Sequence, residues 1–105
     1  GRGQFVAHHL IEIGHDALIS WGVTLRDADG HTIYQGGEAV NQGEPFVRLG
    51  QHVWIGQGVD ILPGTEIGDG AIVGARSLVK GQVPAGSLVA GAPVRVLREG
   101  VEWRA

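Results

Sequence analysis

Histidine is the residue type in this chain best suited to acid–base chemistry, and it occurs five times. An imidazole has an ordinary pKa of about 6.5, so it can take a proton from a hydroxyl group near neutral pH. The five residues are His8, His9, His15, His31 and His52. The chain has no cysteine, which excludes both a thiol nucleophile and a disulfide framework. Which histidine could act as a base depends on the elements that position it.

An aliphatic residue returns every six positions in the second half of the chain, and a small or β-branched residue follows four places after each. The aliphatic residues are Leu49, Ile55, Ile61, Ile67, Val73 and Val79, and the others are Val53, Val59, Thr65, Ala71, Ser77 and Val83. A helix needs a spacing of about 3.6 and a half-buried strand needs alternation. A spacing of six predicts a three-sided parallel β-coil of about 18 residues per turn, in which each hexad forms a short strand and a corner.

Hairpins in a glycine-rich antiparallel sheet are the alternative, but they need paired turn signals at variable spacing. Here the phase holds, and many of the 19 glycines follow the aliphatic residues, where a corner needs positive φ or leaves no room for a β-carbon.

The hexad pattern begins at Ile13 and breaks at His31, which takes a place that should hold an aliphatic residue. Residues 31–46 read as a loop, and loops longer than about 12 residues in compact domains are usually functional or disordered. The coil resumes at Leu49 in the phase of Leu25, which predicts a loop extruded from a continuous coil. Local breaks in a consistent pattern are where function is expected.

His31 is therefore the candidate general base. The other reading of His31 is a loop-start histidine that hydrogen-bonds a turn. His8 and His9 lie outside the repeat, and His15 and His52 take places that point outward.

Length and charge restrict the class of protein further. A chain of 105 residues predicts a single domain over 1–105, with Ser87–Leu97 as a terminal strand and a C-terminal tail over about 85–105. The net charge of −3 argues against a nucleic-acid partner. No apolar run approaches the ~18 residues of a membrane span and no signal peptide is evident, so we expect a cytoplasmic protein. Because the pattern begins almost at once, we also expect a missing N-terminal segment that caps the open end of the coil.

Several segments together resemble one known family. They are Gly50–Gly56 (GQHVWIG), Ile61–Gly70 (ILPGTEIGDG), Gly74–Val79 (GARSLV) and Val83–Val96. The chain resembles the hexapeptide-repeat acyltransferases over about residues 11–104, most closely the sugar and capsular-polysaccharide O-acetyltransferases. The resemblance implies an all-β fold, a left-handed parallel β-helix, and transfer of acetyl from acetyl-CoA, with no metal, to a hydroxyl group. It also implies a homotrimer in which each active site lies between two subunits.

By this resemblance His31 falls on the catalytic histidine of the family. Asp29 could orient its ring, although Asp27–Gly30 is equally a good turn. Asn41 in the loop resembles an asparagine that could hydrogen-bond substrate or backbone.

The resemblance also implies a coenzyme A site. Gln57 and Ala75, one turn apart, match its groove, and an exposed backbone N–H there could stabilise an oxyanion. Trp54 would form an apolar wall or pack at a subunit contact. Arg76 replaces a common glycine and either alters the groove or contacts phosphate. Arg95 and Arg98 match positions where the family places basic residues that could meet the phosphates, and the alternative for the two arginines is a solvated surface pair. Lys80 is a further candidate for this site, but it falls one place before the usual lysine of the family.

Two other functions use the same coil. A γ-carbonic-anhydrase-like metalloenzyme needs three histidines around a zinc-like ion, but Gln57 stands where a third would be wanted after His15 and His52. A non-catalytic scaffold or binding module would show no release of coenzyme A above background.

Overall fold

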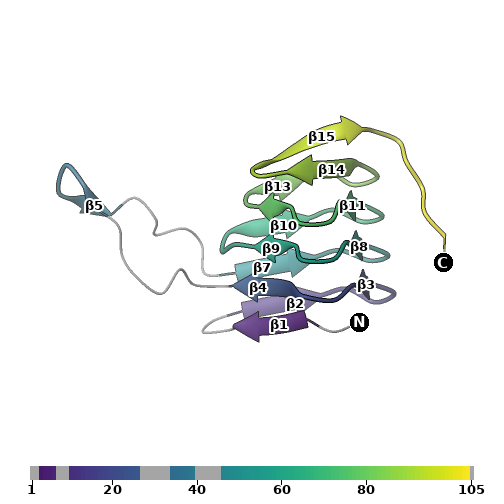
Figure 1. Ribbon diagram of the computed structural model, residues 1–105, viewed down its shortest axis with the longest axis horizontal. Helices are drawn as coiled ribbons and strands as arrows, with labels where there is room; N and C mark the ends of the chain where they lie inside the picture. Colours follow the sequence, from purple (N-terminus) through teal and green to yellow (C-terminus); the bar gives the residue numbers. More distant parts are fainter. Residues whose placement is uncertain (1–2, 7–9, 27–33, 40–45, 105) are drawn as a thin grey trace.

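The computed structural model describes residues 3–6, 10–26, 34–39 and 46–104, and the structural statements below concern these residues. The described chain winds into a coil with three flat faces (Figure 1). Face A contains β1 (Gly3–Val6), β4 (Val23–Arg26), β9 (Asp60–Ile61) and β12 (Leu78–Val79). Face B contains β2 (Leu10–Ile13), β7 (Phe46–Leu49), β10 (Thr65–Ile67) and β13 (Gln82–Val83). Face C contains β3 (Leu18–Ile19), β8 (Trp54–Ile55), β11 (Ile72–Val73), β14 (Leu88–Gly91) and β15 (Val94–Arg98).

Strand pairing within the faces is parallel except between β14 and β15. Trp54 pairs with Ile72 and Asp60 pairs with Leu78, which is 18 residues per turn as the hexads predict. Leu25 pairs with Ile61, 36 residues later, so the segment between β4 and β7 adds one turn's length without changing the phase. The extruded excursion predicted from the sequence is confirmed.

The interior of the coil is filled by the residues that the six-residue period places inward. Ile55, Ile61 and Ile67 are at most 1% exposed, and the fifth-place residues from Val53 to Val83 are at most 4% exposed. Two of those fifth-place residues are polar, and their hydroxyl groups donate to the carbonyl three residues earlier. Thr65 Oγ1 donates to the Leu62 carbonyl at 2.6 Å and Ser77 Oγ to the Gly74 carbonyl at 2.7 Å. A buried hydroxyl must find a partner, so these side chains tie each corner to the strand that follows it.

Three corners join the faces. The BC corner contains Asp16, His52, Gly70 and Gly86, the CA corner contains Gly22, Gly58 and Arg76, and the AB corner contains Gly64 and Gly81, all with positive φ. At most of these positions glycine supplies a conformation that a β-carbon disfavours. Asp16, His52 and Arg76 are the described residues other than glycine that adopt it, with φ of 60°, 55° and 60°.

The excursion leaves face A after β4 and returns to face B at β7, so it emerges at the AB corner. Within it, β5 (Tyr34–Gln35) and β6 (Glu38–Ala39) pair as an antiparallel hairpin that forms a sheet of its own. Among the described residues, no helix has the length and hydrophobicity needed to cross a membrane.

The C-terminal part differs from the sequence-based expectation in two ways. The coil does not end where the predicted tail begins, at about residue 85, because β14 continues face C. It shortens by two residues at the AB corner, so Ile67 pairs with Val83, and Ile72 with Leu88, at a separation of 16. Ser87–Leu97 is not one strand, because β14 turns back at Gly91 into the antiparallel β15. A shorter corner changes the phase of the hexads while keeping aliphatic side chains inward, which the six-residue pattern alone cannot reveal.

Candidate functional site

Three of the predicted site residues, Asp29, His31 and Asn41, lie outside the described residues. Their roles remain predictions. The segment that contains these three residues leaves the coil after β4 and rejoins it at β7, and both points lie at the AB corner.

The predicted coenzyme A groove residues lie together at the CA corner. Gln57 and Ala75 occupy equivalent places in adjacent turns and both are exposed. The Arg76 amide donates to the Gln57 carbonyl at 2.7 Å, which ties the two turns together. A β-carbon on Gly58 would stand 3.5 Å from Arg76 Cγ, so the arginine side chain extends over the turn below. In the described part of the chain, the backbone N–H groups of Gln57 and Ala75 make no hydrogen bond and could bind a ligand.

Arg95 and Arg98 lie on β15, the strand that covers the last turn. The Gly91 amide, at the start of the hairpin turn, donates to Ser77 Oγ at 3.2 Å, so this turn stands over the CA corner. Arg95 pairs with Ala90 one residue beyond the turn, and Arg98 pairs with Leu88 at the far end. Both side chains are exposed. Arg95 is therefore the nearer of the two to the groove residues.

Lys80 lies at the AB corner, one residue before Gly81, and is exposed. Face A separates it from the CA corner, so a single chain does not bring Lys80 to the groove residues. It shares a corner with the excursion that carries His31.

Trp54 projects from the outer side of face C and is 39% exposed. Its strand neighbours on that side, Leu18 and Ile72, pair with it directly. Trp54 thus belongs to a ladder of outward-facing apolar side chains on face C, and its role as an apolar wall of the active site stays a prediction.

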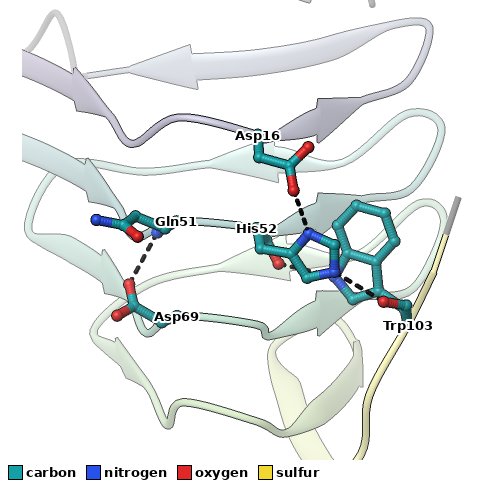
Figure 2. Close-up of polar contacts among 5 residues, drawn as sticks. All are labelled: Asp16, Gln51, His52, Asp69 and Trp103. Atoms are coloured by element: carbon teal, nitrogen blue, oxygen red, sulfur yellow. Dashed lines mark hydrogen bonds and ion pairs between the residues drawn. The ribbon is translucent and has the colours of Figure 1, made fainter.

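Sequence reasoning missed a second constellation, formed at the BC corner by Asp16, His52 and Trp103 (Figure 2). Asp16 Oδ2 lies 2.6 Å from His52 Nδ1, and the Trp103 carbonyl lies 2.7 Å from His52 Nε2. The indole N–H of Trp103 donates to the His52 carbonyl at 2.7 Å. The two rings stack at 3.7 Å with an interplanar angle of 2°.

These contacts favour the charged imidazolium. The Trp103 carbonyl and then the Asp16 carboxylate raise the pKa of His52 above 6.5, against an opposing effect of desolvation. Both ring nitrogens face oxygen acceptors, so neither offers a lone pair to a substrate hydroxyl. With both nitrogens engaged by Asp16 and the Trp103 carbonyl, His52 is not placed to act as a general base.

A signal for this cluster exists in the sequence, although no single hexad contains it. Asp16 and His52 stand 36 residues apart, which is the separation of every β2–β7 and β3–β8 pair, and both replace the glycine that suits such a corner. Trp103 could not have been placed, because the tail follows no repeat. The cluster borders a surface hollow of about 480 Å³ that Gly70, Val101, Glu102 and Arg104 complete.

Among the described residues, no group of three or more His, Asp or Glu side chains is placed to hold a metal ion.

Comparison with known proteins identifies related sequences. The profile of the bacterial transferase hexapeptide family (six repeats) matches residues 46–81. Galactoside O-acetyltransferase of Escherichia coli K12 is 38% identical over 90% of this chain and 46% of its own length. Polysialic acid O-acetyltransferase of E. coli O1:K1 is 32% identical over 89% of this chain and 31% of its own length.

Solved structures agree with the sequence comparison. The polysialic-acid-specific acetyltransferase NeuO superposes with a TM-score of 0.86 at 28% identity, over 98% of this chain and 50% of that one. Galactoside acetyltransferase in complex with coenzyme A superposes with a TM-score of 0.80 at 35% identity, over 93% of this chain and 49% of that one. The present chain spans about half the length of the curated relatives it matches first, at 50% and 46%.

Proposed function

Since the chain is a member of the hexapeptide-repeat transferases and has their left-handed parallel β-helix, we propose that it is an acetyl-CoA-dependent O-acetyltransferase. Its acceptor is a hydroxyl group of a sugar or polysaccharide precursor. The observation that carries this proposal is the likeness to a galactoside acetyltransferase whose structure contains coenzyme A, which extends over 93% of the chain at 35% identity. Use of acetyl-CoA is also what supports the expected cytoplasmic location.

The reaction assigned to the site is acyl transfer by direct attack. His31 takes the proton from the acceptor hydroxyl as its oxygen attacks the thioester carbonyl carbon. An exposed backbone N–H at the CA corner, such as that of Gln57 or Ala75, stabilises the resulting oxyanion. The C–S bond then breaks, the imidazolium returns its proton to the sulfur, and the products are the acetyl ester and free coenzyme A.

The position of the two corners supports a site shared between subunits. The excursion with His31 leaves at the AB corner, whereas Gln57, Ala75 and Arg76 lie at the CA corner across face A. Packing of one coil beside another brings an AB corner of one chain to a CA corner of the next. A closed trimer would make three such sites, each with a base from one subunit and a coenzyme A groove from its neighbour.

In the shared site, Arg95 and Arg76 bind the phosphates of coenzyme A from the groove subunit. Arg98 extends that positive surface along β15. Lys80 comes from the same subunit as His31, because both belong to the AB corner. Asp29 orients His31, and Asn41 contacts the acceptor.

Release of free thiol from acetyl-CoA in the presence of a panel of sugars tests the proposal. The expected result is acceptor-dependent release together with an acetylated sugar detected by mass spectrometry, from a species that sediments as a trimer. No release above background with any hydroxyl acceptor would favour a non-catalytic scaffold instead.

A further inference from the structure

The last residues of the described chain do not extend away from the coil. After β15 the tail runs back along the coil toward the level of β8 (Figure 1). The Val101 amide donates to the Gly86 carbonyl at 2.8 Å, and two residues later Trp103 reaches His52, two turns closer to the N-terminal end. Trp103 is only 8% exposed although it belongs to a tail whose neighbours, Glu102 and Arg104, are exposed. The tail is thus held at one buried side chain.

The partners of Trp103 are built into the corner at a conformational cost. Gly70 and Gly86 form the BC corner in the upper turns, whereas the lower turns use Asp16 and His52 with φ of 60° and 55°. A left-handed backbone is unfavourable for residues other than glycine. The side chains at these two positions offset that cost through the ion pair and the stacked indole, so the corner is adapted to hold the tail.

Trp103 also contacts the wall of the proposed acyl site. Its ring centroid lies 6.0 Å from that of Trp54, with the planes tilted by 50°. Trp54 is three residues before Gln57: it begins β8, and Gln57 lies in the CA corner that follows this strand. The indole of Trp103 therefore lies beside that of Trp54, which stays 39% exposed.

We propose that Trp103, clamped by His52 and Asp16, is a positioning residue that holds the Trp54 indole against face C, so that the docked tail shapes the acyl-binding wall. The proposal rests on the proposed function for its effect on catalysis. The geometric part, that Trp103 fixes Trp54, stands independently.

The charge on His52 determines how firmly the clamp holds. A neutral imidazole has one N–H and would leave its other nitrogen facing an acceptor oxygen, either Asp16 Oδ2 or the Trp103 carbonyl. Other charged or titratable groups nearby are His15 beside Asp16, Asp69 in the next turn, and the tail pair Glu102 and Arg104. The backbone N–H of Gln51 donates to Asp69 Oδ1 at 2.8 Å, and Glu102 and Arg104 form an ion pair at 3.6 Å. Asp16 is therefore the carboxylate that compensates the imidazolium.

Indole N–H resonances of the ¹⁵N-labelled protein test the geometric part. Each of the three tryptophans gives one signal, and single substitutions to Phe assign them. In Trp103→Ala the Trp54 signal should shift and broaden, because its neighbouring ring is gone. In Arg104→Ala, the matched change in the same tail, it should stay in place. An unchanged Trp54 signal in Trp103→Ala overturns the proposal, provided that circular dichroism shows an intact coil. Trp103→Phe, which keeps a stacked ring, supplies a second reading and should shift the Trp54 signal less than Trp103→Ala does.

Steady-state kinetics test the catalytic part. Trp103→Ala should lower kcat by about ten-fold while changing the acetyl-CoA KM little, because misplacing a positioning group costs up to about 10²-fold in rate. A Trp54 signal that moves while kcat stays at the wild-type value overturns the catalytic part of the proposal, that the docked tail shapes the acyl-binding wall. A wild-type protein without any transferase activity refutes the proposed function instead, and the resonance experiment still decides whether Trp103 positions Trp54.

Discussion

At the scale of single residues, the hexads assign each side chain to the interior or the surface, and adjacent residues of one strand have opposite environments. Ile67 on β10 is 1% exposed, whereas its neighbour Glu66 is exposed. We expect Ile67→Ala to lower the free energy of unfolding by about 2–5 kcal/mol, because the lost methyl groups leave a cavity between stacked turns. Glu66→Ala should change it by less than about 0.5 kcal/mol. Denaturant unfolding measures both, and equal losses would contradict the assigned orientation.

His52 is the residue whose charge the structure predicts most directly. Its pKa is raised above 6.5 by the Trp103 carbonyl and by Asp16, so the folded state favours the imidazolium. The stabilisation is fully present below the unfolded value of about 6.5 and is lost as the pH rises through the raised folded value.

An NMR titration of the His52 ring measures this effect. The wild-type midpoint should lie above 6.5 and should move down in Asp16→Asn, which removes the carboxylate but keeps its size. A His52 midpoint at or below 6.5, or one that Asp16→Asn leaves in place, would rule out the charged clamp.

At the scale of elements, glycines at the corners act for two different reasons. A β-carbon on Gly68 would lie 2.7 Å from Ala85 Cα in the next turn, whereas one on Gly70 would meet nothing within 4 Å. Gly70 is needed only for its φ of 72°.

Gly68→Ala should therefore destabilise the coil more than Gly70→Ala. The backbone conformation at Gly70 costs about 1 kcal/mol for alanine, whereas forcing two turns apart at Gly68 adds about 1–3 kcal/mol. The melting temperatures of the two variants measure this difference within a single corner. A larger loss of stability for Gly70→Ala would show that the close approach of the two turns at Gly68 does not determine the stability of this corner.

The elements that the sequence predicts are those fixed by a local repeat. Inward aliphatic residues and corner glycines determine the three faces, and the unbroken phase across the excursion follows from the same rule. The two-residue shortening at the AB corner, the turn back at Gly91 and the docking of Trp103 each depend on contacts between distant residues. The contact between Asp16 and His52 could be predicted only in part, because the 36-residue spacing brings the two residues together but does not reveal what their side chains do.

At the scale of the whole molecule, the predicted groove residues Gln57, Ala75 and Arg76 lie along the CA corner, and the predicted phosphate-binding residues Arg95 and Arg98 lie on β15. Arg95 and Arg98 are exposed there, beyond Gln57 and Ala75. The double change Arg95→Ala with Arg98→Ala should raise the acetyl-CoA KM more than it lowers kcat, because the phosphates are remote from the reacting carbonyl.

Arg48→Ala is the matched control for that variant, since Arg48 is half exposed on face B and pairs with Glu12 at 3.4 Å. Its acetyl-CoA KM should equal that of the wild type. If the Arg95 and Arg98 double variant also keeps the wild-type KM, the two arginines form only a solvated surface pair.

The assignment as a transferase depends finally on the histidine of the excursion acting as the base. The most direct measurement is turnover of His31→Ala at saturating acetyl-CoA and acceptor, beside His15→Ala as the control on the exposed face of the coil. For His31→Ala we expect kcat to fall by a factor of about 10² to 10⁴, with coenzyme A binding and the fold intact, and for His15→Ala we expect wild-type turnover. Near-normal turnover of His31→Ala would contradict the assignment of His31 as the base.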